Sequence, residues 1–166
     1  MLKILKTVVI ISFAFSNAVL ANNYPSRPVK VIVPFAPGSA SDTVARTVAD
    51  KLTLAMGQPF IVENRAGAGS TIANEYVAKA APDGYTLLIS TAALPIGASA
   101  YPNLKYDTSS FVSITVFTNS ALALAVNPDF PAKNAKDFIE YARANPGKIN
   151  FGSLGVGTSH HVTAEK

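Results

Sequence analysis

The sequence predicts an α/β fold built on a parallel sheet, and two observations support that prediction. Three short runs rich in β-branched and other apolar residues, at 29–34, 60–63 and 85–90, have the length and composition of buried strands. Two segments with apolar side chains at helical spacing, about 41–56 and 70–81, alternate with these runs. This alternation is typical of right-handed βαβ units on a parallel sheet, so this part of the chain is predicted to form a Rossmann-like lobe.

The first predicted strand leads into a turn that is suited to bind an anion. Pro34, Pro37 and Gly38 end the strand and require a tight turn, and Ser41 or Asp42 is predicted to cap the helix that follows. Backbone N–H groups converge at such a helix start, where the helix dipole adds partial positive charge, so a carboxylate or a phosphate fits there. The loop has neither a GxGxxG pattern nor a Walker lysine, which disfavours a nucleotide. The plain alternative is a strand–helix turn without a ligand.

Residues 1–21 have the pattern of a secretory signal peptide. Lys3 and Lys6 precede a short apolar core, and the small residues around position 21 suit cleavage after Ala21. The core is too short for a stable membrane span, and the chain has no cysteine for a lipid anchor or for disulfides. We therefore expect an exported protein that depends on its hydrophobic core for stability.

Charge and motif content argue against several classes of function. The chain has 14 Lys and Arg against 10 Asp and Glu, and its basic residues are scattered, which argues against a nucleic-acid partner. Ser153 or Ser159 with His160 or His161 is conceivable as a nucleophile and base, but no G-x-S-x-G pattern surrounds either serine and no acid partner is placed. The two adjacent histidines would need further ligands to hold a metal. We predict no catalytic residue, no metal site and no cofactor.

The third predicted strand ends at the same edge of the sheet as the first, so the hydroxyls of Ser90 and Thr91 can reach the same ligand. The alternative for these two residues is simple helix capping. Farther along, we expect strands at 111–117, 122–127 and 149–151 and a helix at 135–144.

A second Gly/Ser loop, 152–161, follows the last of these strands and resembles the first loop in composition and position before a helix. One helix, one strand and a helix start cannot bury a core of their own. The expected organisation is therefore a signal peptide at 1–21, a first lobe at 22–121, and at 122–166 a crossover with the start of a truncated second lobe.

Five stretches taken together resemble a known family: VIVPFAPG at 31–38 with Asp42 and Arg46, VENRAGAG at 62–69, APDGYTLL at 81–88, ANPGK at 144–148, and 153–165. They are similar to the solute-binding receptors of tripartite tricarboxylate transporters, the Bug family. The resemblance implies a two-lobed, type II periplasmic-binding-protein-like fold that captures a small mono- or dicarboxylate. It also implies a periplasmic location, a monomer, and delivery of the ligand to membrane permease subunits.

In this family, two facing loops hold the ligand carboxylates largely through backbone N–H groups and water. Carried over to this sequence, and with Thr91 added from the sheet-edge argument, the expected ligand-binding residues are Phe35, Ala36, Pro37, Gly38, Ser39, Ala40, Ser41, Asp42, Thr91, Ser153, Gly155, Gly157, Thr158 and Ser159. Ser39 stands where the family usually has a glycine. The alternative functions are an exported sensor or adaptor that docks on a membrane partner and, less favoured, an exported hydrolase.

Overall fold

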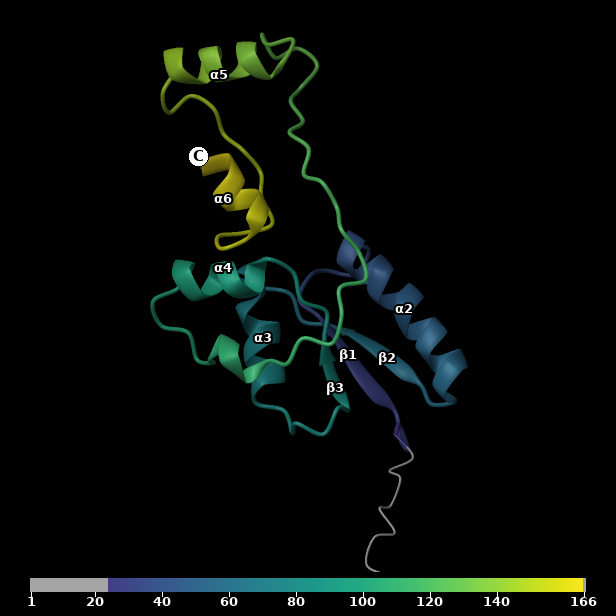
Figure 1. Ribbon diagram of the computed structural model, residues 1–166. Helices are drawn as coiled ribbons and strands as arrows, with labels where there is room; N and C mark the ends of the chain where they lie inside the picture. The colour runs from purple at the N-terminus through teal and green to yellow at the C-terminus, as the bar shows by residue number, and fades with distance from the viewer. Residues whose placement is uncertain (1–23, 166) are drawn as a thin grey trace, which may run out of the picture.

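A computed structural model describes residues 24–165 of the protein (Figure 1). The predicted signal peptide at 1–21 lies outside the described residues. The elements follow in the order β1 (Val29–Val33), α2 (Ala40–Met56), β2 (Phe60–Asn64), η2 (Ala68–Ser70), α3 (Thr71–Ala78), β3 (Thr86–Leu88), α4 (Ala93–Ala100), η3 (Thr108–Ser110), α5 (Ala135–Ala144) and α6 (Ser159–Glu165). None of the helices in this range is both long and apolar enough to cross a membrane.

The sheet of the described residues has three strands in the order β2-β1-β3, and both pairings are parallel. Val31, in the middle of β1, lies opposite Val62 of β2 and Leu87 of β3. The predicted βαβ alternation and the parallel sheet are therefore confirmed. The central strand is the most apolar of the three because a parallel strand between two neighbours is covered on both faces.

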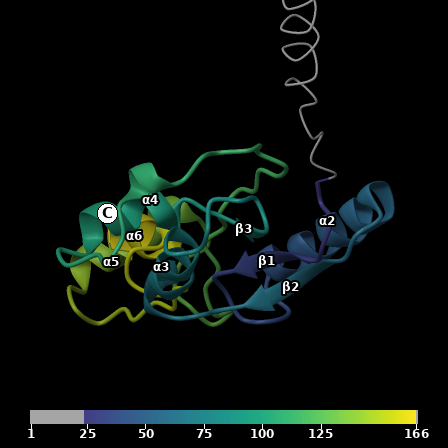
Figure 2. The ribbon, with the colours of Figure 1, turned by 90° about the horizontal axis from the view of Figure 1, so that it is seen from below.

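The two connecting helices cover opposite faces of this sheet (Figure 2). Ala45 and Ala49 of α2 pack against the side chains of β1 that point to one face, which are Val29, Val31 and Val33. Successive side chains of a strand alternate between faces, so Ile32 points the other way, where α3 packs against β1 and β3. Ile32 is 0% exposed, which shows that both faces of the central strand are sealed.

The boundaries of the first two helices differ from the sequence prediction. Ser39, rather than Ser41 or Asp42, caps α2: its backbone is extended, and its Oγ accepts a hydrogen bond of 3.3 Å from the N–H of Asp42. The helix therefore begins one residue earlier than expected, at Ala40. The helix α3 ends at Ala78 rather than at residue 81. The residue before Pro82 is biased away from helical backbone, so the helix does not reach residue 81.

The helix α4 is missing from the sequence prediction, which leaves residues 93–100 without an element. Pro95 and Gly97 lie within it, and both residue types usually argue against a helix. Pro95 falls in the first turn, where its missing N–H would have had no partner within the helix. Gly97 is buried in α4, and a Cβ there would meet the hydroxyl of Tyr106 at 3.7 Å, an ordinary contact distance that does not by itself require glycine.

The strands predicted at 111–117, 122–127 and 149–151 are wrong: no residue of these segments is in a strand. After η3 the chain runs in an extended course away from the sheet to α5 (Figure 1). Val112 is 90% exposed and Ile114 is 77% exposed. A strand exists only when a neighbour completes its hydrogen-bond ladder, and none of the described residues lies alongside these segments as a ladder partner.

The helix predicted at 135–144 is confirmed with the same bounds, as α5. Asn134 caps it by accepting a 3.0 Å hydrogen bond from the N–H of Asp137. Its apolar side packs on the preceding turn, where the ring of Phe130 lies 5.6 Å from that of Phe138 and 5.0 Å from that of Tyr141. No residue of α5 is fully buried, so this helix rests on local contacts.

Candidate ligand-binding site

Three loops leave the carboxyl edge of the sheet side by side. The N–H of Arg65 donates to Val33 O at 2.8 Å, and the N–H of Ile89 donates to Ile32 O at 2.9 Å, so the chain following β2 and β3 is fixed to the end of β1. The connection from β1 to β2 by α2 and the connection from β2 to β3 by α3 run in opposite directions across the sheet. Ligands of open α/β sheets bind at such a switch point.

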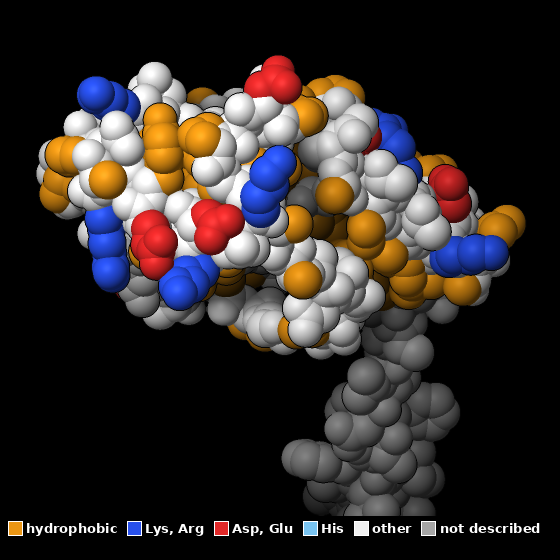
Figure 3. All heavy atoms as spheres, turned by 90° about the horizontal axis from the view of Figure 1, so that it is seen from above, with side chains coloured by type: hydrophobic (Ala, Val, Ile, Leu, Met, Phe, Trp, Pro, Cys, Tyr) orange, Lys and Arg blue, Asp and Glu red, His pale blue; other side chains and the backbone are white. Residues whose placement is uncertain are grey.

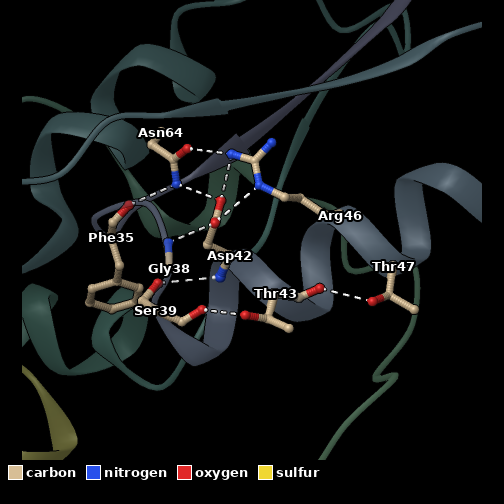
Figure 4. A network of polar contacts seen from close by, with 8 residues as sticks. All are labelled: Phe35, Gly38, Ser39, Asp42, Thr43, Arg46, Thr47 and Asn64. Carbon is tan, nitrogen blue, oxygen red and sulfur yellow. Dashed lines mark hydrogen bonds and ion pairs between the residues drawn. The ribbon is translucent and has the colours of Figure 1, made fainter.

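Asp42 organises the loop between β1 and α2 (Figure 4). Its carboxylate is almost fully buried, at 3% residue exposure, and accepts a 2.8 Å hydrogen bond from the N–H of Gly38. It also accepts from Asn64 Nδ2 at 2.9 Å and forms an ion pair with Arg46. The Asn64 amide donates to Phe35 O at 3.0 Å and accepts from Arg46 at 3.1 Å. One network therefore joins the loop, the helix α2 and the end of β2.

The same contacts determine the charge of this network. Hydrogen bonds from the Arg46 guanidinium, the Gly38 N–H and the Asn64 amide lower the pKa of Asp42 from 3.8 to about 2. Asp42 is therefore ionised at neutral pH, and the adjacent Arg46 guanidinium offsets its charge. An anion at the start of α2 thus faces no unpaired negative charge from this side chain.

Several of the expected backbone donors are already used within the loop. The N–H of Gly38 bonds Asp42, the N–H of Ser39 bonds Ala36 O at 3.2 Å, and the N–H of Asp42 bonds Ser39 Oγ. Pro37 has no N–H. Within residues 24–165, the N–H groups of Phe35, Ala36, Ala40 and Ser41 form no hydrogen bond. Of these, Ala40 and Ser41 are the first two residues of α2, where the helix dipole favours an anion.

Thr91 lies two residues before α4, in the chain that follows β3. Its Oγ1 accepts a 3.3 Å hydrogen bond from the N–H of Ala93, and its carbonyl accepts from the N–H of Leu94 at 3.0 Å. The N-cap of α4 is Ala92, which has no side-chain cap bond, so Thr91 contacts the helix start from one residue before the cap. The hydroxyl hydrogen of Thr91 is not used by that bond, since the oxygen accepts it.

The second loop, residues 153–159, packs on the first α/β unit. Thr158 is 2% exposed, and its hydroxyl donates to Gly155 O at 2.7 Å. The carbonyl of Val156 accepts a 2.7 Å hydrogen bond from the hydroxyl of Tyr101, just past α4. Among the described residues no hydrogen bond joins this loop to residues 35–42. The two predicted parts of the site therefore do not contact each other through hydrogen bonds.

Four residues that organise the two loops were not among the predicted site residues: Arg46, Asn64, Gly69 and Tyr101. The Gly-rich stretch after Asn64 is visible in the sequence as a loop, yet nothing in its spacing reveals that it meets a segment almost ninety residues away. Tyr101 sits in a stretch that sequence patterns leave unassigned. The contacts of all four arise from tertiary packing.

The geometry gives no support to catalytic or metal chemistry. In the described part of the chain, neither Ser153 nor Ser159 is hydrogen-bonded to His160 or His161, and no group of three or more metal-ligating side chains is present. The ring of His161 lies 6.0 Å from that of Phe151. On the face shown in Figure 3, basic and acidic side chains are interspersed, without a continuous basic stripe.

A parallel α/β unit whose first loop has free N–H groups at the switch point is compatible with the solute-binding class of proteins. Residues 44–166 match the family model of the tripartite tricarboxylate transporter family receptor, TctC. The chain belongs to this family, which is one of transport receptors rather than enzymes.

Sequence relatives agree with the family match. A UPF0065 protein of Bordetella pertussis is 41% identical over 146 residues, which are 87% of this chain and 45% of that protein. The protein BugT of the same organism is 37% identical over 150 residues, which are 89% of this chain and 46% of that protein. The chain spans less than half the length of these relatives.

Solved structures give the same result. A periplasmic transporter is 46% identical, with a TM-score of 0.74 over 80% of this chain and 45% of that one. An R. palustris protein solved with adipate is 32% identical, with a TM-score of 0.71 over 86% of this chain and 48% of that one. MatC from Rhodopseudomonas palustris, solved with bound malate, is 36% identical, with a TM-score of 0.64 over 73% of this chain and 42% of that one. The predicted fold class and family are therefore confirmed.

Proposed function

We propose that this chain captures a small mono- or dicarboxylate outside the cytoplasm and presents it to the membrane permease subunits of a tripartite tricarboxylate-type transporter. The supporting observation is the pair of free N–H groups of Ala40 and Ser41 at the sheet's switch point, next to an acidic side chain whose charge is already offset. Two structural relatives were solved with adipate and with malate, which are small carboxylates. In this proposal residues 1–21 direct export and are removed after Ala21, and the receptor acts as a monomer.

The first loop binds one carboxylate of the ligand in this proposal. The Asp42 network holds the loop in place before the ligand arrives, so little conformational entropy is lost on binding. Ala40 and Ser41 donate their N–H groups to the carboxylate, and each neutral hydrogen bond contributes on the order of 1 kcal/mol net. The remaining residues of 35–42, with Thr91, border the ligand in this proposal. The second loop supplies contacts from Ser153, Gly155 and Ser159, while the buried Gly157 and Thr158 hold its shape.

The test removes one donor and leaves the helix intact. Ala40 is the first residue of α2, where proline is favoured, and Ser39 before it already has the extended backbone that a following proline requires. Ala40→Pro therefore deletes one free N–H without breaking the helix. We expect malate and adipate to shift the amide NMR signals of 35–42, and the variant to bind about fivefold more weakly, which is the effect of one neutral hydrogen bond.

Ala135→Pro is the matched control, because Ala135 is the first residue of α5 and also follows an extended cap residue. It should change no ligand-induced shift in the first loop. Equal affinities of Ala40→Pro and the unmodified chain would refute the role of this donor. No saturable shift in residues 35–42 with either acid would refute the carboxylate-binding function.

A further inference from the structure

The second loop packs tightly against the first α/β unit, with glycines at the points of closest contact. The carbonyl of Val156 accepts the hydrogen bond from Tyr101 and lies directly against the backbone of Gly69. A Cβ built on Gly69 would lie 2.1 Å from Val156 O, and a Cβ on Gly157 would lie 2.8 Å from the ring of Tyr101. Real Cβ atoms do not approach so closely, so both positions require glycine on steric grounds. We name the Gly69, Tyr101, Val156 and Gly157 set the loop-docking contact.

The side of this contact that belongs to the first unit has an unusual backbone. Four consecutive residues from Gly67 to Ser70 have positive φ, and two of them, Ala68 (φ 45°) and Ser70 (φ 84°), are not glycines. Left-handed backbone at such residues costs free energy and persists only where the surroundings hold it. Such strained backbone clusters at functional positions in proteins, and here the segment contacts the second loop.

Hydrogen bonds from neighbouring side chains hold residues 67–70 in this conformation. The hydroxyl of Thr71 donates to Ala68 O at 2.9 Å, and Ser70 Oγ accepts from Asn74 Nδ2 at 3.2 Å. Asn74 is fully buried in α3 and also bonds the hydroxyl of Tyr106 at 3.0 Å. The segment is thus a rigid platform for the Val156 carbonyl.

We propose that Gly69 and Tyr101 are positioning residues that fix the second loop on the first α/β unit. Through this contact they set the spacing between the second loop and the start of α2, and with it the length of dicarboxylate that fits between them. The docking half of this inference needs no ligand, whereas the length-selection half rests on the proposed function. A side chain at residue 69 would displace the Val156 carbonyl and so change this spacing.

Hydrogen exchange of the ligand-free full chain tests the docking. Tyr101→Phe removes only the hydroxyl, and we expect exchange at the amide of the buried Thr158 to become about fivefold faster, the effect of one neutral hydrogen bond. Gly69→Ala should accelerate it further. Tyr24→Phe is the matched control, because its hydroxyl also donates to a glycine carbonyl, Gly84 O at 2.6 Å, without touching the second loop.

For the glycine, Gly147→Ala is the control. Gly147 has the same kind of backbone (φ 73°), but a Cβ there meets no atom within 4 Å. It should cost conformational strain without changing exchange at Thr158. Unchanged exchange in both Tyr101→Phe and Gly69→Ala would overturn the docking contact.

NMR titrations with succinate, glutarate and adipate test the selection of length. Gly69→Ala should change the ratio of succinate to adipate dissociation constants by about tenfold, the lower end of what one methylene decides in a fitted site. Gly147→Ala should leave this ratio unchanged. Faster exchange with an unchanged ratio would overturn length selection and leave the docking contact. If the unmodified chain binds none of the three acids, the proposed function and length selection both fail, and the exchange data still decide the docking.

Discussion

Two regions of this molecule contain similar β-branched runs and fold in different ways. The runs at 29–33, 60–64 and 86–88 pair into a parallel sheet, whereas those at 111–117 and 122–127 remain extended and unpaired among the described residues. Ile32 is fully buried in the first region, and Ile114 is largely exposed in the second. The comparison teaches that an apolar run becomes a strand only where a neighbouring strand and a covering helix are available.

Helices do not depend on such neighbours to the same degree. The helices α2 and α5 both form, although three residues of α2 and none of α5 are fully buried. Each has a capping side chain at its start and satisfies its backbone hydrogen bonds within itself. Local signals therefore suffice to specify a helix at the surface, whereas a strand forms only when tertiary structure supplies a partner strand.

The largest expected effect separates the two regions directly. Ile32→Ala should destabilise the protein by about 2–5 kcal/mol, because it empties a sealed site on the central strand. Ile114→Ala makes the same chemical change at an exposed site and should alter stability by less than about 0.5 kcal/mol. Urea unfolding measures both. Equal losses in the two variants would mean that residues 111–117 are buried in the folded protein.

The second-largest expected effect is the loss of the stability that ionised Asp42 contributes, which depends on pH. Asp42→Asn removes the charge that holds Arg46 and the Gly38 N–H, so it should lower stability at neutral pH by less than Ile32→Ala does. The pKa of Asp42 is about 2 in the folded protein, against 3.8 for an aspartate without these contacts, as in the unfolded chain. The stability that its ionised form contributes is therefore complete above pH 3.8 and is lost as the pH falls through about 2.

Thermal unfolding between pH 2 and 5 should accordingly show a shallower pH dependence for Asp42→Asn than for the unmodified protein. Asp50→Asn is the matched control, since Asp50 lies exposed on the same helix and makes no ion pair among the described residues. The difference between the pH profiles of the two variants gives the contribution of Asp42 apart from that of other carboxylates. Identical pH profiles would exclude the buried network as the source of the dependence.

The smallest effect compares the two helix caps. Ser39→Ala should cost about 1 kcal/mol in global unfolding, because α2 covers the core and its loss exposes the sheet. Asn134→Ala removes the equivalent cap from α5, which no other element needs for its burial. It should accelerate hydrogen exchange within α5 and leave the urea midpoint unchanged. A shift of that midpoint as large as that of Ser39→Ala would show that α5 unfolds together with the sheet.

The sequence predicted the elements of the fold wherever local patterns decide the outcome. The three strands of the sheet, their parallel arrangement and the bounds of α5 follow from periodicity, capping residues and turn residues. The helix α4 was missed because Pro95 and Gly97 argue against a helix, and only the structure shows that Pro95 falls in the first turn, where proline is tolerated. The unpaired segments at 111–117 and 122–127 were predicted as strands because the sequence cannot show whether a neighbour is present.

The candidate site was predictable to a similar extent. The turn at 34–38 and the helix start after it place the first loop without any structure. The sequence does not reveal that the Gly38 N–H is taken by Asp42 or that Asn64 completes the network, because these contacts join residues from different elements. Nor does it show that Gly69 lies against Val156. Which N–H groups remain free for a ligand is therefore a question for the structure.

Residue-resolved hydrogen exchange of the unmodified chain tests most directly the claim that the two regions differ in the burial and pairing of their apolar runs. Strand β1 and helix α2 should be protected to the level of global unfolding, since their amides open only when the sheet is lost. Amides of 112–117 and 122–126 should exchange close to the rate of an unfolded chain, because no ladder protects them. Protection of 112–117 equal to that of β1 would contradict the account, since it would mean that this segment is a paired strand.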